Sequence, residues 1–361
     1  MEQKIKHFID ALSTPQISLS TLFLLFFIIM LMFLKQVTRG RFFWTFFSAL
    51  IIGTLFSLTD PNFWLIATKP DNIPIGIMLF LAIFFTWLAL KQGVDNDDRI
   101  AAGGIPREKM ETPQKVMVWP DLVYIEFICL ILATVFLVVW SIYIKAPLEE
   151  PASLAQTPNP SKAPWYFLGL QEMLVYFDPW LAGVVFPTLI ITGLMAIPYI
   201  DVNPKGNGYY TFKERKFAIM TFCFGFLILW IALIVLGTFL RGPNWNFFGP
   251  FEFWDIHKVE ALTNVNLSEY FWVRWLNKPL PDNMILRELP GFITLAGYFL
   301  FLPPLFAFVL MKNMYKKMGI LRFNIMIIHF IIMLGLPIKM YLRWLFNLKY
   351  IIAIPEYFFN I

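Results

Sequence analysis

Residues 163 to 170 read Ala-Pro-Trp-Tyr-Phe-Leu-Gly-Leu, and they close a loop that connects two long apolar runs, Asp121 to Ile144 and Leu181 to Tyr199. Five prolines punctuate this loop: Pro147, Pro151, Pro158, Pro160 and Pro164. Because proline fixes φ and lacks an amide hydrogen, a continuous helix is excluded before Pro164, whose fixed φ suits a first helical turn. We therefore expect a short helix from Trp165 to Tyr176.

The composition requires a membrane. Hydrophobic residues make up 58% of the 361 residues, charged residues make up only 15%, and there are 40 Phe. A single soluble domain of this size would have too little polar surface to cover itself. The net charge of +5 suits anionic lipid headgroups and requires no nucleic-acid partner.

Apolar runs of membrane-spanning length predict an all-α integral membrane protein. In lipid such runs form helices, because only a helix satisfies its own backbone hydrogen bonds. About eight runs are long enough: Ile17 to Leu34, Phe42 to Leu58, Ile73 to Leu90, Asp121 to Ile144, Leu181 to Tyr199, Phe217 to Leu240, Gly291 to Met311 and Phe323 to Leu342. The short helix after Pro164 would then lie at the membrane surface, in the loop after the fourth span.

The distribution of Lys and Arg predicts which side each loop faces. Four loops that would share one side hold 16 of these residues: 35–41, 91–119, 200–216 and 312–322. The opposite loop 59–72 holds only Lys69. The positive-inside rule places the first group in the cytoplasm, and the loop 145–180 and both ends of the sequence outside. Three basic residues near the end of the sequence run against this pattern: Lys339, Arg343 and Lys349.

The sequence offers few ligands for a redox cofactor. It contains three histidines, His7, His257 and His329, and no Cys-x-x-Cys-His motif. Two b haems need two pairs of facing histidines, and a covalent c haem needs that motif. We assign no metal ligands to this chain. If electron transfer is the activity, the iron cofactors must belong to partner subunits.

The expected short helix combines apolar and polar residues. Trp165 to Leu168 provide aromatic and aliphatic surface, and Gln171 and Glu172 add polar groups. A quinol site needs apolar walls for the ring and tail, together with one or two groups that can take hydroxyl protons. The same composition also fits an interfacial aromatic belt that binds no ligand.

Three pieces of sequence resemble the C-terminal domain of cytochrome b and subunit IV of the photosynthetic plastoquinol complex. They are Trp119-Pro120-Asp121, then Pro160-Ser161-Lys162-Ala163-Pro164-Trp165-Tyr166-Phe167, and then Gly183-Val184 with Pro198-Tyr199-Ile200-Asp201. The resemblance runs from Trp119 to about Pro243. The family's signature tetrapeptide is Pro-Glu-Trp-Tyr, and its distance to the Gly-Val pair is the same here without gaps.

The resemblance implies a haem-free subunit of a bacterial bc-type quinol:cytochrome c oxidoreductase in the cytoplasmic membrane. A separate N-terminal cytochrome b subunit would carry the b haems, a Rieske protein the 2Fe-2S cluster, and a c-type cytochrome would be a further partner. Menaquinol or ubiquinol would be oxidised on the outer side. The quinol would bind against five residues of this chain: Pro164, Trp165, Tyr166, Phe167 and Leu168. A two-fold symmetric dimer is the family's expected assembly.

One position departs from the family pattern. Ala163 and Pro164 stand where the family usually has Pro and Glu, so the carboxylate regarded as the quinol's proton acceptor is absent. The same alignment puts Gln171 where mitochondrial relatives carry a tyrosine that lines the site. Glu172 is near enough to face the same pocket, where apolar walls would favour its protonated form. We hypothesise that Glu172 takes over as acceptor. The alternative is a Glu172 that faces water or pairs with Lys162.

The sequence divides into five expected parts: an accessory three-helix membrane module (1–92), a polar cytoplasmic linker (93–118), the cytochrome b C-terminal-like core (119–243), an aromatic outer loop (244–290) and a two-helix extension (291–361). In the linker, Asp95-Asn96-Asp97-Asp98 and Gly103-Gly104 are expected to break the helical pattern. The outer loop fits either an interface belt or a docking surface for an electron-carrier subunit.

Two rival functions remain open. A purely structural or assembly subunit would keep the fold but would have lost the quinol site together with the missing Glu. A secondary transporter would place polar groups on broken helices at mid-membrane and would show inverted repeats, and the sequence displays neither feature.

Overall fold

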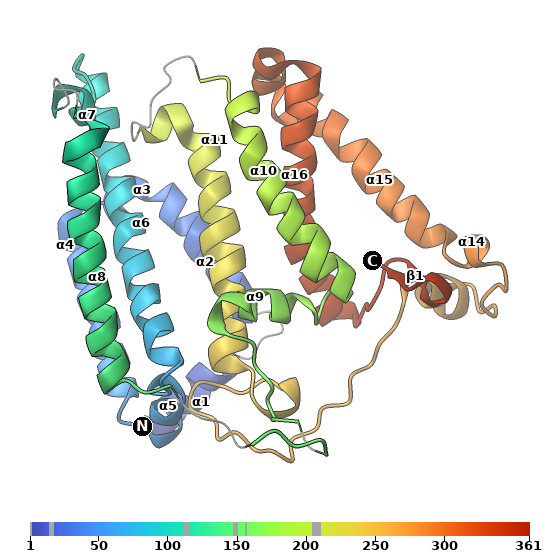
Figure 1. The fold of residues 1–361 in the computed structure, drawn as a ribbon. Coiled ribbons are helices and arrows are strands. Elements are labelled where there is room, and N and C mark those ends of the chain that lie inside the picture. The colour runs from blue at the N-terminus through green and yellow to red at the C-terminus, as the bar shows by residue number, and fades with distance from the viewer. Residues whose placement is uncertain (1, 14–17, 112–115, 147–150, 156, 204–210) are drawn as a thin grey trace.

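The computed structural model describes residues 2–13, 18–111, 116–146, 151–155, 157–203 and 211–361. Within them, seven helices are long and apolar enough to cross a membrane: Gly40–Ser57, Asn72–Ala101, Val118–Tyr143, Leu181–Ile200, Phe212–Leu240, Leu289–Leu310 and Lys312–Phe346. A shorter apolar helix, Thr21–Met32, corresponds to the first expected span. The prediction of an all-α multi-pass membrane protein is confirmed (Figure 1).

The described residues up to 101 form six helices: α1 (Glu2–Ser13), α2 (Ser18–Met32), α3 (Leu34–Val37), α4 (Gly40–Ser57), α5 (Pro61–Ala67) and α6 (Asn72–Ala101). α5 begins where Asp60 accepts hydrogen bonds from the backbone N–H groups of Asn62 and Phe63, at 2.9 and 3.2 Å. Lys6 of α1 donates to the same carboxylate at 2.7 Å. This pairing fixes α1 against the turn between α4 and α5.

The expectation that Asp95 to Asp98 break the helix is wrong, because α6 continues to Ala101. Two of these polar residues have partners that offset their burial. The Asp97 carboxylate accepts from the backbone N–H of Lys213 at 3.0 Å, and Asn96 Oδ1 accepts from the backbone N–H of Arg107 at 3.0 Å. The helix ends before Gly103, whose φ of +82° favours glycine. The short helix α7 (Arg107–Glu111) follows.

The next part of the chain contains α8 (Val123–Tyr143) after η1 (Val118–Leu122), α9 (Trp165–Met173), and η2 (Leu181–Val185) continued by α10 (Phe186–Ile200). A further long helix runs through α11 (Phe212–Cys223), η3 (Phe224–Trp230), α12 (Ile231–Val235) and η4 (Leu236–Leu240), followed by η5 (Pro243–Trp245). α9 lies across the long helices near one end of the bundle (Figure 1). It packs on α12 and η4. Its close approach to η4 depends on Gly237, where a Cβ would lie 3.3 Å from the carbonyl oxygen of Leu168.

Among the seven candidate spans, the one that contains α8, Val118–Tyr143, differs from the others because none of its residues is buried. Even its central Leu, Ile, Val and Phe side chains are exposed, for example Leu132 at 64% and Phe136 at 60%. In a membrane such a surface faces acyl chains or another subunit.

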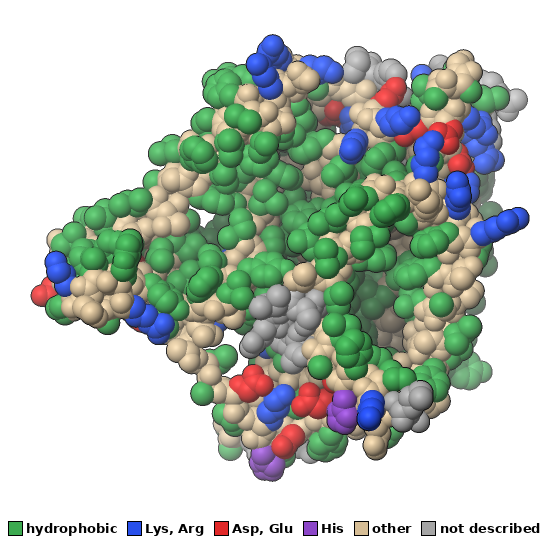
Figure 2. Space-filling view, turned by 180° about the vertical axis from the view of Figure 1, so that it is seen from behind, with side chains coloured by type: hydrophobic (Ala, Val, Ile, Leu, Met, Phe, Trp, Pro, Cys, Tyr) green, Lys and Arg blue, Asp and Glu red, His purple; other side chains and the backbone are tan. Residues whose placement is uncertain are grey.

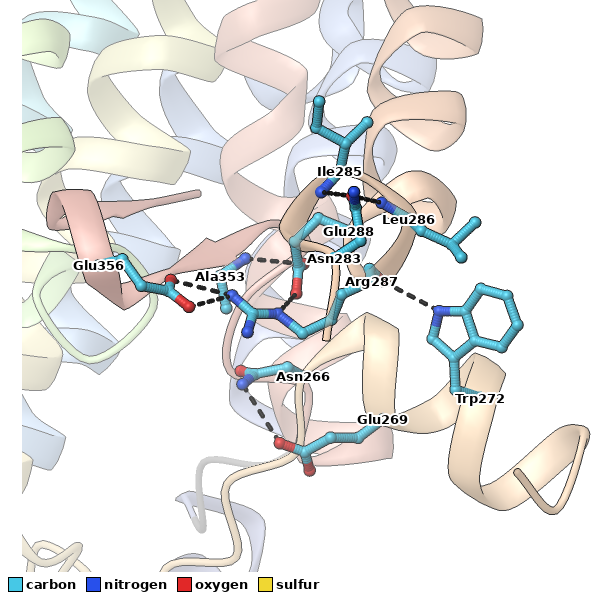
Figure 3. A network of polar contacts seen from close by, with 10 residues as sticks. All are labelled: Asn266, Glu269, Trp272, Asn283, Ile285, Leu286, Arg287, Glu288, Ala353 and Glu356. Carbon is cyan, nitrogen blue, oxygen red and sulfur yellow. Dashed lines mark hydrogen bonds and ion pairs between the residues drawn. The ribbon is translucent and has the colours of Figure 1, made fainter. Parts of the chain in front are cut away.

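The last third of the chain contains α13 (Leu267–Glu269), η6 (Tyr270–Trp275), α14 (Met284–Arg287), α15 (Leu289–Leu305), η7 (Phe306–Leu310), α16 (Lys312–Phe346) and a small hairpin made of β1 (Ala353–Ile354), η8 (Pro355–Tyr357) and β2 (Phe359–Asn360). Figure 3 shows the polar network at the start of α15. Arg287 forms an ion pair with Glu356 of the hairpin, in which its Nη2 donates to both carboxylate oxygens at 2.9 Å. The buried Glu288 carboxylate accepts from the backbone N–H of Ala353 at 3.0 Å.

The two ends of the bundle differ in charge. α1, α5 and α9 lie at one end, which we call the α9 end (Figure 1). In Figure 2 Lys and Arg side chains gather mainly at the opposite end, and hydrophobic side chains cover most of the surface between the two ends. An apolar belt between two polar ends matches the dimensions and chemistry of a bilayer.

The contact between α15 and the C-terminal segment allows a packing test at Gly291. A Cβ at this position would lie 2.2 Å from the backbone oxygen of Ile351, so Gly291→Ala must displace backbone and should lower stability by roughly 1 to 3 kcal/mol. Gly297 on the same helix has no neighbouring atom within 4 Å of such a Cβ, so Gly297→Ala is the matched control and should leave stability unchanged or slightly raised. Thermal unfolding in detergent measures both, and equal midpoints for the two variants would contradict the packing.

Candidate functional site

The short helix α9 begins where the sequence predicts, because Pro164 adopts an extended ψ of 148° and Trp165 is the first helical residue. The helix ends at Met173, three residues before the expected end at Tyr176. Its buried face consists of Leu168, Gly169, Glu172 and Met173. The opposite face, which includes Tyr166 and Phe167, is about half exposed.

A cavity of about 990 Å³ lies at the first turn of α9. Residues from four segments that are distant in sequence line it, and these segments lie within 62–75, 140–146, 160–168 and 252–254. The volume is large enough for a cofactor-sized ring with part of a tail. Lys69 and Asp71, each about half exposed and 3.7 Å apart, provide charged groups on the wall that comes from the turn between α5 and α6.

The structure brings together only part of the predicted quinol-binding set. Pro164, Trp165 and Leu168 line the cavity. Tyr166 and Phe167 do not line it, and their rings instead pack on each other with centroids 4.7 Å apart. The physical reason is the helical periodicity, which turns successive side chains by about 100° and points these two away from the cavity.

Gln171 shapes the loop and does not line the cavity. Its Oε1 accepts from the backbone N–H of Ala163 at 2.8 Å, and its Nε2 donates to the carbonyl oxygen of Ser161 at 2.8 Å. The side chain thus bridges both neighbours of Lys162 and holds the loop against α9.

Glu172 is fully buried and forms an ion pair with Arg241, at the end of the helix Phe212–Leu240. Arg241 donates from Nη2 to Oε1 at 2.8 Å and from Nε to Oε2 at 3.0 Å. The Tyr176 hydroxyl and the Trp245 indole N–H donate to the same carboxylate at 3.0 and 3.2 Å. Burial alone would lower the pKa of Arg241, but the nearby Glu172 charge raises it above its ordinary value. The four donors together provide hydrogen bonds to both oxygens of the Glu172 carboxylate.

The expectation that Glu172 faces the same pocket as Trp165 is wrong, because Glu172 does not line the cavity. The two residues are seven positions apart, which separates them by about 10 Å along a helix. The alternative pairing of Glu172 with Lys162 is not present either, since Arg241 occupies the carboxylate. The role of Glu172 as proton acceptor stays a prediction.

Lys162 is a cavity residue that the sequence reasoning did not select. Its Nζ donates to the carbonyl oxygen of Thr238 at 2.8 Å and lies 4.8 Å from the centre of the Trp254 ring. Burial and the positive charge of Lys69 lower the pKa of Lys162 to about 7. The sequence feature that could have indicated Lys162 is its place directly before the tetrapeptide position 163–166, in a loop next to apolar helices.

None of the three histidines lines the cavity. His329 Nδ1 lies 2.7 Å from the carbonyl oxygen of Ile325, and its Nε2 lies 3.4 Å from Thr192 Oγ1 on α10. His257 is an exposed residue of the outer loop. Among the described residues, no group of three or more His, Cys, Asp or Glu side chains could hold a metal ion.

Residues 151–248 match the family model described as Cytochrome b(C-terminal)/b6/petD. This segment of a longer membrane chain is similar to the C-terminal domain of cytochrome b, and it includes α9 and the Glu172–Arg241 pair. Cytochrome b-type domains belong to membrane oxidoreductase complexes of the bc and b6f type, which involve quinol and haem. No solved structure gives a significant match to the chain.

The buried pair predicts a large stability loss when one partner is removed. Arg241→Met leaves the Glu172 carboxylate buried without its counter-charge, so the free energy of unfolding should fall by roughly 3 to 5 kcal/mol. Arg322→Met is the matched control because Arg322 is an exposed residue of α16. Adding Glu172→Leu to Arg241→Met should recover part of the loss. Thermal unfolding in detergent measures these changes, and a double variant less stable than Arg241→Met would contradict the pairing.

Proposed function

We propose that this chain forms one wall of the outer-side quinol-oxidation site in a bc-type quinol:cytochrome c oxidoreductase. The observation that carries the proposal is the cavity at the start of α9, where the cytochrome b-like segment contributes Pro164, Trp165 and Leu168. The cavity has the mixture that a quinol needs, with an apolar wall and a small number of polar groups.

The chemistry divides between this chain and its partners. Quinol oxidation releases two protons and two electrons. An N-terminal cytochrome b subunit with b haems and a Rieske protein with a 2Fe-2S cluster would take one electron each, and a c-type cytochrome would receive electrons further on. The residues of this chain bind the ring, exclude water and provide groups near the quinol hydroxyls. Both menaquinol and ubiquinol fit this scheme, and the complex would be dimeric.

The charge distribution supports the orientation that this function needs. The loops 35–41, 91–119 and 312–322 hold 12 of the 29 Lys and Arg residues, and their described parts lie at the end of the bundle opposite α9. The positive-inside rule places that end in the cytoplasm of a bacterial cell. The cavity would then open toward the outer side, where the protons are released.

The exposed helix α8 supports a partner within the membrane. A helix with no buried residue makes almost no contact with its own chain, and Trp140 near its end lines the cavity. A cytochrome b subunit packed against α8 would complete the wall that this chain leaves open. We also propose that 1–92 and 291–361 are accessory modules. The module 1–92 has a further role, because residues between Asn62 and Ile75 line the cavity.

A second candidate is a structural or assembly subunit without a working quinol site. One observation favours it, because Glu172 is held by Arg241 and does not reach the cavity that lacks the family's Glu. The two candidates differ in whether a ligand in the cavity affects turnover.

The proposal is tested by purifying the intact complex through this chain. We expect b haem in its optical spectrum and quinol:cytochrome c reductase activity that a quinol-site inhibitor abolishes. A colourless preparation without haem-bearing partners would contradict the bc-type assignment. If the complex contains haem but substitutions in the cavity leave its quinol turnover unchanged, the structural candidate is favoured.

A cavity-filling variant tests the location of the site. Ala146 lines the cavity and is exposed, so Ala146→Trp should fill space there without disturbing the packed core. We expect a rise in the quinol KM or a loss of inhibitor affinity of about tenfold or more, which corresponds to about 1.4 kcal/mol. Ala101→Trp, an exposed position at the end of α6, is the control and should behave as the unchanged protein. Unaltered quinol kinetics in Ala146→Trp would exclude this cavity as the site.

Glu172→Gln tests the hypothesis that Glu172 accepts the quinol proton. If it does, turnover should fall by about 10²-fold or more and the pH profile should change. Haem content of the purified complex controls for assembly, because the variant also weakens the buried pair with Arg241. Near-normal turnover with the same pH profile would exclude Glu172 as the acceptor.

A further inference from the structure

The cavity has a basic group two residues before the position where the family's acidic group is missing. Lys162 stands one residue before Ala163 and Pro164, which replace the family's Pro and Glu, and its side chain lines the cavity. Gln171 bridges the residues on both sides of Lys162 and so fixes the direction of the loop. The position of the side chain therefore follows from several contacts of the surrounding fold.

The surroundings of Lys162 are only partly satisfied. A protonated Lys162 Nζ can donate three hydrogen bonds. Its described contacts are one hydrogen bond to the Thr238 carbonyl oxygen and the face of the Trp254 ring. In the part of the chain that the structure describes, two buried side-chain polar atoms lack a hydrogen-bond partner, Thr238 Oγ1 and Trp254 Nε1. Both belong to residues that contact Lys162. Because such atoms normally find partners, their grouping shows that the polar groups around Lys162 are incompletely hydrogen-bonded.

The charges around Lys162 are mixed. Lys69 on the turn between α5 and α6 and Arg241 on the neighbouring helix disfavour a charged ammonium, and Glu172 on α9 favours it. Glu252 and Asp71 also line the cavity. With burial added, the pKa of Lys162 lies near 7, so a neutral amine is available at physiological pH.

We infer that Lys162 accepts the first proton of the bound quinol, in place of the carboxylate that the family carries on the adjoining tetrapeptide. The inference rests on the proposed function. In this step the O–H bond of one quinol hydroxyl breaks, an N–H bond forms at the Lys162 lone pair, and the quinol becomes its monoanion. No electron moves in the step. The two electrons of the quinol would be taken up by cofactors of the partner subunits.

The test compares variants of Lys162 in the intact complex. Lys162→Met keeps the apolar stem but has no acceptor, and Lys162→Arg stays protonated at all working pH values. In the unchanged protein, turnover should rise as the pH rises through about 7, because the protonated amine cannot accept. Both variants should lose about 10²-fold in turnover and should also lose this rise near pH 7. Lys278→Met, an exposed lysine of the outer loop, should change neither property.

A second measurement is independent of turnover. Acetic anhydride reacts with neutral amines, so mass spectrometry should detect acetylation of Lys162 that increases between pH 6 and pH 8 about as the neutral fraction does. A quinol-site inhibitor should protect Lys162 and leave Lys278 reactive. Haem content per complex shows whether each variant has assembled.

The outcomes separate this inference from the proposed function. A complex without b haem or inhibitor-sensitive turnover overturns both. A complex with normal inhibitor-sensitive turnover, in which Lys162→Met and Lys162→Arg keep the rate and the rise near pH 7, overturns only the role of Lys162. If Glu172→Gln removes that rise and the Lys162 variants keep it, the acceptor is Glu172.

Discussion

The ion pair between Glu172 and Arg241 is the interaction on which the site depends. It joins the short surface helix α9 to the end of the helix Phe212–Leu240, and both side chains are at least nine-tenths buried. A pair of buried charges is costly to desolvate, so it persists only with good geometry and further hydrogen bonds. Tyr176 and Trp245 provide these bonds. The arrangement holds α9 flat on the bundle and sets the position of the loop before it.

The loop before α9 inherits its position from this attachment. Gln171 is the neighbour of Glu172 on α9, and it binds the backbone on both sides of Lys162. Buried charge at one end of a short helix thus determines where a lysine lies at its other end. This chain of contacts links a stabilising interaction to the group that we propose for proton transfer.

The segments outside the cytochrome b-like segment line part of the cavity and contact that segment. The turn between α5 and α6 forms one wall of the cavity, and Asp97 of α6 accepts a hydrogen bond from the first turn of α11. At the other side of the domain, Lys339 of α16 donates to the carbonyl oxygen of Tyr176 at 3.1 Å. Asn360 of the C-terminal hairpin donates to the Asp178 carboxylate at 3.0 Å. Both flanking modules therefore contact the segment that carries α9, and neither is a separate appendage.

The sequence by itself determined the membrane-spanning helices and the start of α9. These follow from local rules. Long apolar runs must form helices in lipid, and a helix can begin only after Pro164, because proline lacks the amide hydrogen that a helix interior needs. The resemblance to cytochrome b indicated the family to which the segment around α9 is similar. The match of residues 151–248 to the family model supports this resemblance. The helix α6 shows the limit of local rules, since Asp97 is tolerated there only because Lys213, 116 positions away, provides a backbone donor.

Only the tertiary structure decided which polar residues face the cavity. Glu172 and Lys162 are both charged residues near the tetrapeptide, and no local pattern distinguishes them. Arg241, 69 positions from Glu172, withdraws the carboxylate into the core, and Thr238 and Trp254 direct Lys162 to the cavity. These partners are distant in sequence and come together through packing, so their effect on burial and charge cannot be read from neighbouring residues.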